Sequence, residues 1–321
     1  YFLSQQPYDL KASALFGELY WTPPETLKVT GGLRYTKDEK RVLNIPTRIL
    51  QPGRGYPLGT PAAPKAEFDA VTGRLGFDWK PELGFTRDTL VYAFYSKGYK
   101  GGGLNPPSAV GFAGTEPVFD PEYVNSYEIG TKNTLLDGAL RFNATAFFYD
   151  YKNYQVSKIA NRQSVIENID AEVRGADFEL FWTPAPGLQI NGSLGLLDSE
   201  IKSGASIDTF DRTAGDPNFA VIKSITGQTC IAPPALIAAA INAVNAGAPV
   251  ASMLTVCLNP AAREGNLKDL SGNQLPNAPK TTLNLGIQYD WTLTGDWAAS
   301  VRAYYYRQGA TFARVYNSDA D

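Results

Sequence analysis

The longest patterned stretch of the chain alternates strictly between apolar and polar residues, and it follows a tight turn at Asp137-Gly138. The apolar series is Leu140, Phe142, Ala144, Ala146 and Phe148, and the intervening series is Arg141, Asn143, Thr145, Phe147 and Tyr149. Side chains two apart in a β-strand share a face, so the pattern predicts a strand with two different faces. At about 18 residues it is roughly three times the usual length, which favours a tilted barrel wall over a soluble sandwich.

The same alternation recurs along the rest of the chain and predicts ten strands in all. They are Leu10–Trp21, Leu27–Arg41, Phe68–Lys80, Thr89–Lys100, the two strands of the hairpin Pro121–Ser157, Val165–Trp182, Leu188–Ile201, Lys280–Trp291 and Trp297–Phe312. Their connections run short, long, short, long, short, medium, short, very long, short. In an up-and-down meander every second connection lies on the same rim, so one rim has tight turns and the other long loops. This sorting is typical of outer-membrane barrels, with the longest loop, about residues 202–278, outside the cell.

The predicted fold class is therefore all-β, an antiparallel up-and-down transmembrane β-barrel. In a soluble barrel the charged faces would meet solvent, whereas in a membrane barrel they line a wet lumen. Charges in the middle of the polar faces, opposite broad apolar faces, favour the lumen. The residues expected to face it are Arg34, Arg74, Arg141, Asn143, Asp177, Glu179, Asn284 and Arg302.

Aromatic residues lie near the strand ends, beside the short turns. They are Tyr20, Trp21, Trp79, Trp182, Tyr289, Trp291 and Trp297. Tyrosine and tryptophan concentrate where a membrane meets water, so these residues predict one interfacial girdle, although they would also suit ordinary strands.

Composition excludes several functions. The net charge of −3 with no basic cluster argues against nucleic acid as a partner. The absence of histidine removes most metal sites and most general-base chemistry, so we expect no cofactor and no enzyme, including an outer-membrane protease of ten strands. Gly101-Gly102-Gly103 lacks a following Lys-Ser/Thr and is interpreted as a flexible exit from a strand rather than a phosphate loop.

The two cysteines, Cys230 and Cys257, both fall in the longest predicted loop. In an oxidising compartment we expect them to pair, with two unpaired thiols as the alternative. A closed loop of about 28 residues would stabilise the fold by roughly 3 kcal/mol in the chain-entropy model. Within it, Pro234–Asn245 has the composition of a helix.

Five segments, in this order, resemble TonB-dependent outer-membrane receptors of the iron and siderophore type. They begin at Glu18 (ELYWTPPETLKVTGGLRYTKDEK), Tyr95 (YSKGYKGGGLNP), Pro121 (PEYVNSYEIGTKNTLLDGALRFNATAFFYDYKNYQV), Glu172 (EVRGADFELFWTPAPGLQINGSLG) and Gly272 (GNQLPNAPKTTLNLGIQYDW). The resemblance covers nearly the whole chain except the long loops.

The resemblance implies a barrel of roughly 22 strands, plugged by an amino-terminal domain, in the outer membrane of a Gram-negative bacterium. It implies import of a scarce nutrient, most often a ferric siderophore, with energy from the inner-membrane TonB complex acting through the plug. The plug and the coupling box have no counterpart here, so we expect residues 1–321 to be part of one barrel domain, with a non-native amino terminus and an open sheet. A passive porin-like channel and a soluble secreted β protein are the alternatives.

Ligand contacts are expected from inward side chains near the long-loop rim, because aromatic rings and cations suit anionic iron chelates. Counting alternate positions selects Lys97, Tyr99, Tyr151 and Gln155. The alternative is that these side chains meet the plug or nothing at all.

Overall fold

The computed structural model describes residues 2–48, 56–57, 63–106, 116–160, 163–223, 229–249, 256–257, 259–293 and 295–318. One large sheet dominates it, and its strands follow one another in chain order. They are β1 (Phe2–Trp21), β2 (Leu27–Arg48), β4 (Lys65–Trp79), β5 (Thr86–Lys100), β8 (Glu122–Leu135), β9 (Leu140–Ala160), β10 (Gln163–Ala185), β11 (Leu188–Ser203), β16 (Thr281–Thr292) and β17 (Ala298–Gln308). The short β3 (Tyr56–Pro57) pairs with β2.

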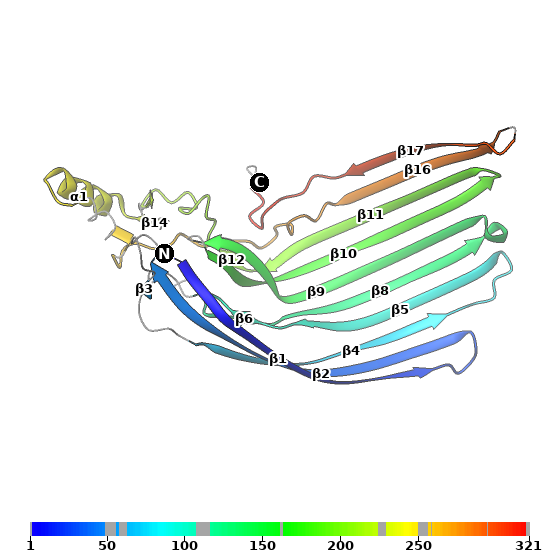
Figure 1. Ribbon diagram of the computed structural model, residues 1–321, viewed down its shortest axis with the longest axis horizontal. Helices are drawn as coiled ribbons and strands as arrows, with labels where there is room; N and C mark the ends of the chain where they lie inside the picture. Colours follow the sequence, from blue (N-terminus) through cyan, green and yellow to red (C-terminus); the bar gives the residue numbers. More distant parts are fainter. Residues whose placement is uncertain are drawn as a thin grey trace.

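All of these pairings are antiparallel, so the chain forms the meander that the alternation predicts. Within the described residues β1 and β17 pair with β2 and β16 alone, and the sheet is open, as expected. Figure 1 shows a long, curved wall with the short turns at one end and the long connections at the other.

The connection between β9 and β10 differs from the predicted medium loop. β9 continues to Ala160, past Ser157, and β10 begins at Gln163, before Val165, so the two strands are slightly longer and the connection shorter than expected. The hydroxyls of Ser157 and Ser164 lie 3.0 Å apart across it. The register shifts between Ile169 and Ala171 of β10, which pair with Tyr154 and Tyr151 of β9. The β-bulge on β9 interrupts the alternation of faces and reverses its parity beyond this point.

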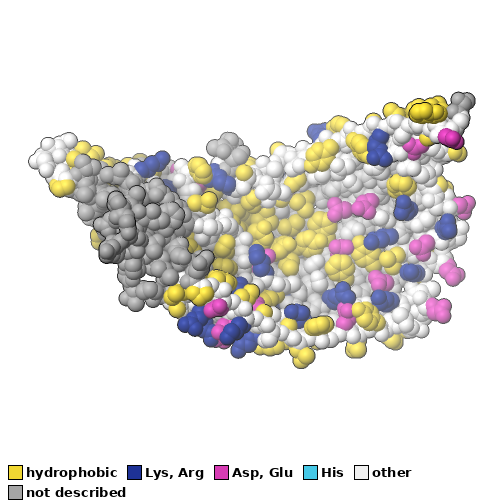
Figure 2. Space-filling view, viewed as in Figure 1, with side chains coloured by type: hydrophobic (Ala, Val, Ile, Leu, Met, Phe, Trp, Pro, Cys, Tyr) yellow, Lys and Arg dark blue, Asp and Glu magenta, His cyan; other side chains and the backbone are white. Residues whose placement is uncertain are grey.

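The register assigns the eight residues expected in the lumen to one face of the sheet. Asn143 lies opposite Glu179, Glu179 opposite Ser193, and Ser193 opposite Asn284. We call this the charged face. Figure 2 shows it with side chains of both charges spread along the strands as far as the turn end.

The opposite side, the apolar face, carries a band of hydrophobic residues on each strand. On β9 the band runs from Leu140 to Phe148 and ends before Asp150, and on β4 it runs from Trp79 to Val71. Many of its side chains are exposed, such as Leu33 at 70% and Leu285 at 47%. Eight residue steps along a tilted strand rise by about 20 Å, close to the apolar band of a membrane barrel.

The predicted girdle is largely on this face. Trp21, Trp79 and Trp182 project from it at the turn end, as do Tyr289 and Trp291, whose rings stack at 5.7 Å. Tyr20 does not belong to the girdle, because its register places it on the charged face, where its hydroxyl donates to Glu18.

Residues 204–279, close to the predicted long loop of about residues 202–278, contain a folded unit that we call the cap. It consists of β12 (Ala205–Ser206) paired with β15 (Lys268–Asp269), the hairpin β13 (Ala220–Lys223) and β14 (Thr229–Ala232), and α1 (Pro234–Asn245). Pro234 starts the helix, where the missing N–H of proline costs no hydrogen bond. In the part of the chain that the structure describes, no helix is long and apolar enough to cross a membrane.

The expected disulfide joins Cys230 and Cys257, whose Cα atoms lie 5.8 Å apart. Both cysteines are buried with Ile222, Ala232 and Val256, and Leu236 of α1 packs on the same cluster. The disulfide therefore closes the small core of the cap around the helix that the composition predicted.

Candidate ligand-binding rim

The connection between β5 and β8 folds back over the mouth of the wall at the long-loop end. Its first residues, Gly101–Asn105, form a segment that we call the rim bridge; it includes β6 (Gly103–Leu104), which pairs with β7 (Val118–Phe119). The carbonyl oxygen of Gly101 accepts from Lys40 Nζ of β2 at 3.5 Å and from Gln155 Nε2 of β9 at 3.2 Å. One backbone carbonyl thus joins strands that are separated by β4, β5 and β8 in the sheet.

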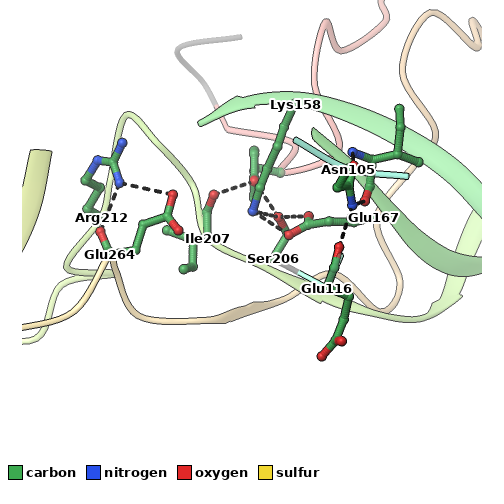
Figure 3. Close-up of polar contacts among 10 residues, drawn as sticks. Asn105, Glu116, Lys158, Glu167, Ser206, Ile207, Arg212 and Glu264 are labelled. Atoms are coloured by element: carbon green, nitrogen blue, oxygen red, sulfur yellow. Dashed lines mark hydrogen bonds and ion pairs between the residues drawn. The ribbon is translucent and has the colours of Figure 1, made fainter. Parts of the chain in front are cut away.

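Leu104 and Asn105, the last two residues of the rim bridge, fix it to strands on both sides. Leu104 packs in a small core with Val42 of β2 and Ala66 of β4. Asn105 is 4% exposed and makes two hydrogen bonds to the backbone of Ile166 on β10, at 2.8 and 2.9 Å (Figure 3). Because a buried amide without partners is costly, these bonds hold the bridge against the wall.

The glycine run follows the end of β5 at Lys100, as the predicted strand exit does, and it allows this close approach. A Cβ atom on Gly102 would lie 2.4 Å from the carbonyl oxygen of Phe119 and 2.7 Å from Cζ of Phe68. Any side chain there would push the bridge away from β4 and β7. The physical requirement is close contact of backbones rather than freedom of movement.

Two of the four predicted ligand contacts, Lys97 and Tyr99, have the parity of the apolar face. Lys97 lies opposite Asn125 in the register, on the same side as Tyr95 and Tyr127, which is the apolar face. Tyr99 has the same parity, but β5 pairs with β4 only up to Lys97. Beyond that point the Tyr99 hydroxyl donates to Asp38 Oδ2 of β2 at 3.0 Å, beside Gly101 of the rim bridge. The parity count failed because aromatic residues occupy both faces of β5.

The other two predicted residues lie at the mouth. Gln155 anchors the rim bridge, and it also donates to the carbonyl of Asp120 at 3.2 Å. Its backbone N–H donates to Glu122, which in turn pairs with Lys100 at 3.4 Å. Tyr151 projects from the charged face directly below these contacts.

Tyr151 belongs to a column of aromatic rings along β9 that sequence reasoning missed. Phe147 stacks on Tyr149 at 4.9 Å, Tyr149 meets Tyr151 edge-on at 6.5 Å, and Tyr151 meets Tyr154 at 5.3 Å. The signal is the run FFYDYKNYQ, in which the bulge near Asn153 returns Tyr154 to the side of Tyr151. We call these four residues the aromatic column.

Charged and polar groups surround the lower end of the aromatic column. Tyr92 donates to Glu128 at 2.9 Å and lies equally close to Thr145, while Asn143 donates to Glu179 at 3.1 Å. The Arg141 guanidinium lies 4.7 Å from the centre of the Phe181 ring. The described residues hold no cluster of three or more metal-binding side chains. This arrangement can bind a ring-bearing, polar ligand by stacking and hydrogen bonding.

A buried polar relay attaches the cap to the wall beside the rim bridge. Lys158 of β9 pairs with Glu167 of β10 at 2.5 Å, and both reach Ser206 of β12. Ser206 lies 2.9 Å from the Tyr316 hydroxyl, which donates to the carbonyl of Ile207 at 2.7 Å (Figure 3). Burial raises the pKa of Tyr316 to about 12. The hydroxyl therefore remains a donor at neutral pH.

A wall of long antiparallel strands with an apolar band on one face, charges on the other and long connections folded over one end is the architecture of a membrane-spanning β-barrel. Residues 2–320 match the family described as TonB dependent receptor-like, beta-barrel, and the chain belongs to this family. The barrels of this family lie in the outer membrane.

Solved structures share the fold. The ferric yersiniabactin uptake receptor FyuA from Yersinia pestis is 18% identical with a TM-score of 0.61, and the match covers 97% of this chain and 36% of that one. The siderophore receptor PiuA from Acinetobacter baumannii is 18% identical with a TM-score of 0.54, covering 88% and 31%. The copper transporter OprC is 13% identical with a TM-score of 0.54, covering 91% and 34%. The chain thus spans about a third of the length of these proteins, and identities this low show the fold alone.

Proposed function

We propose that the protein binds a scarce nutrient, a ferric siderophore, at the rim and imports it through the outer membrane of a Gram-negative bacterium. The aromatic column carries this proposal, because it leads from the rim bridge into the charged face. Catecholate-type rings stack on tyrosine and phenylalanine, and Arg141 further down the charged face of β9 suits an anionic chelate. Two proteins with the same fold, FyuA and PiuA, are siderophore receptors, which supports a siderophore as the class of ligand.

Energy for release would come from the inner-membrane TonB complex, acting through a plug domain that fills the lumen. Family membership supports this coupling. The charged face supports it as well, because charges packed in a dry interior would be costly, whereas water or a polar plug satisfies them. In this proposal the cap lies outside the cell and the short turns lie in the periplasm.

A passive porin-like channel is the second candidate. The rim bridge argues against it, since a segment tied to β2, β4 and β10 narrows the mouth that free diffusion would need. The two candidates differ in their requirement for energy.

The test uses the intact receptor in outer membranes, with ferric catecholate and ferric hydroxamate siderophores as probes. Tyr149→Ala should weaken binding of the catecholate probe up to about tenfold, the worth of one aromatic contact. Tyr305→Ala is the matched control, because Tyr305 lies on the apolar face of β17. Uptake should stop when the TonB complex is deleted. Uptake that persists without TonB would support the passive channel, and unchanged binding by Tyr149→Ala would remove the aromatic column from the site.

A further inference from the structure

Residues 309–318, which follow β17, form a segment that we call the strap, and it is fastened to the base of the cap. Arg314 pairs with Asp208 at 2.7 Å, and the Asp208 side chain is 3% exposed. Asn317 accepts from the backbone N–H of Gln274 at 2.6 Å and donates to the carbonyl oxygen of the same residue at 2.9 Å. A buried ion pair and an amide bonded at both ends therefore hold the strap and the cap together as one layer.

One apolar core lies between this layer and the charged face of the wall. Its buried members come from β10, β11, the cap and the strap, and they are Ile169, Ala171, Ile201, Leu270, Leu275, Val315 and Tyr316. Ala171, Ile201 and Leu270 are 0% exposed. Because the core needs side chains from the wall, the cap and the strap, it stays closed only while the layer is docked on the wall.

The upper half of the aromatic column packs against this core. Tyr151 and Tyr154 touch it, whereas Phe147 and Tyr149 are not among its described members. In the register Tyr151 lies opposite Ala171, one of the fully buried residues. The docked layer therefore covers the upper half of the column and leaves Phe147 and Tyr149 open to a ligand.

A bulge at Asn153 brings both tyrosines to the core. Asn153 has a φ of 55°, a left-handed backbone conformation that asparagine adopts more readily than most residues. Its backbone N–H donates to Asp170 Oδ1 at 3.0 Å, and its carbonyl oxygen accepts from Asn168 at 2.8 Å. Side chains of β10 thus hold the bulge, so the backbone beside Tyr151 is fixed without help from the cap.

Tyr151 joins the two halves of the column. Its ring meets that of Tyr149 at 6.5 Å with an interplanar angle of 86°, and Tyr149 stacks on Phe147 at 4.9 Å. The Tyr149 ring is therefore held by a stacked ring and by the edge of a ring that the core immobilises. If the layer lifts, Tyr151 regains rotamer freedom, and Tyr149 loses one of these two fixed neighbours.

We propose that Tyr151 is a positioning residue of the ligand site: the docked cap and strap fix its ring, and its ring fixes Tyr149 for stacking on a ring-bearing ligand. This inference rests on the proposed function, which makes the aromatic column the site of a siderophore with catecholate-type rings. The cap then acts on the site from behind the column, by preorganising it rather than by touching the ligand. Because such coupling is reciprocal, the ligand in turn stabilises the docked cap.

The first measurement needs no ligand. 3-Fluorotyrosine is placed at position 149 of the intact receptor in detergent, and its ring is followed by fluorine NMR. Arg314→Gln leaves the buried Asp208 carboxylate without this partner and should loosen the strap. It should move the fluorine signal toward that of a solvent-exposed ring, and so should Tyr151→Leu, whereas Tyr151→Phe should preserve the signal. Arg302→Gln is the matched control, because Arg302 of β17 donates to Gln288 of β16 within the wall.

The second measurement adds a ferric catecholate to the same receptor. The ligand should slow hydrogen exchange of residues 270–278 and 309–318 in the unaltered protein. Tyr151→Leu keeps an apolar side chain on the core but removes the ring, so it should weaken binding about fivefold, the worth of one ring contact. It should also abolish the ligand-dependent protection of both segments. Tyr151→Phe should restore both the binding and the protection.

Failure of this inference and failure of the proposed function give different results. If the unaltered receptor does not bind the catecholate, the proposed ligand is wrong, and the fluorine signal still reports whether the cap positions Tyr149. An unchanged fluorine signal in both Arg314→Gln and Tyr151→Leu would overturn the inference and leave the proposed function standing. Equal loss of binding in Tyr151→Phe and Tyr151→Leu would also overturn it, because the Tyr151 hydroxyl would then contact the ligand directly.

Discussion

Single side chains hold the long connections in place, and each does so by satisfying groups that would otherwise be buried without partners. Asn105 uses both ends of its amide on the backbone of β10, and Tyr316 uses its hydroxyl on Ser206 and Ile207. Tyr316 is 7% exposed, so its partners have no access to bulk water when it is removed. These residues fix the position of the long connections, and the cost of removing one is the desolvated partner that it leaves unpaired.

Tyr316→Phe should loosen the cap by about 1–3 kcal/mol, the cost of leaving a buried carbonyl unpaired. The expected readout is faster proteolysis of residues 204–279 in the intact receptor. Tyr306→Phe is the control, since its hydroxyl donates to Gln308 on an exposed surface. Unchanged protection in Tyr316→Phe would show that the relay does not hold the cap.

The pH dependence follows from the same group. The pKa of Tyr316 is raised from 10.0 to about 12 by burial, so its contribution to stability is complete below pH 10. It is lost as the pH rises through about 12, because the unfolded form ionises first. Tyr316→Phe should remove this part of the alkaline destabilisation of the cap, measured by proteolysis at pH 9 and pH 11.

Each strand separates the lipid-facing side of the sheet from the lumen side, because successive side chains point to opposite faces. Phe142 and Asn143 are neighbours on β9, yet Phe142 is part of the apolar band and Asn143 donates to Glu179 on the charged face. Phe142 is 37% exposed although it is a large hydrophobic residue, which suits a surface covered by lipid.

Phe142→Arg should cost about 2–4 kcal/mol near the bilayer midplane and reduce the assembled receptor in the outer membrane. Asn143→Arg should have a milder effect because the charged face meets water or polar protein. Heat-modified migration on gels and the amount of folded receptor per cell give the comparison. Equal loss in both variants would contradict the assignment of the two faces.

The sequence alone was sufficient for the ten strands, their order and the two faces. Alternation is a local pattern, and a one-residue slip in register would move every apolar residue of a strand to the charged face. It was insufficient for Lys97, since the stretch Tyr92–Tyr99 has aromatic residues at both parities. The rim bridge could not be foreseen either. Its contacts join Gly101 to Lys40 and Gln155, residues that are distant in sequence and meet only after the wall has curved.

On the scale of the whole molecule, the connections are sorted to opposite ends of the wall. Figure 1 shows the short turns together, and α1, β12 and β14 near the other end with the rim bridge. This sorting gives the protein a direction, with a binding end and a turn end. In the proposed function the binding end meets the medium.

Single cysteine substitutions, made in the receptor with its native disulfide intact, test which end of the wall faces the medium. Ala246→Cys, just after α1, should react with a membrane-impermeant maleimide on intact cells. Asp137→Cys, in the turn between β8 and β9, should react only after the outer membrane is permeabilised. The native disulfide provides the unreactive background, measured in the unaltered protein. Reaction of Asp137→Cys on intact cells would invert the orientation.

The rim bridge has a mechanical consequence for the wall. The rim bridge is hydrogen-bonded to β2, packed against β4 and hydrogen-bonded to β10 on the other side. It therefore spans the curved wall like a chord across an arc, and its length sets the curvature of the strands between. The strands between them cannot flatten or splay at this end without breaking buried hydrogen bonds. In the proposed function the rim bridge also divides the aperture at this end, so an imported ligand would pass beside it.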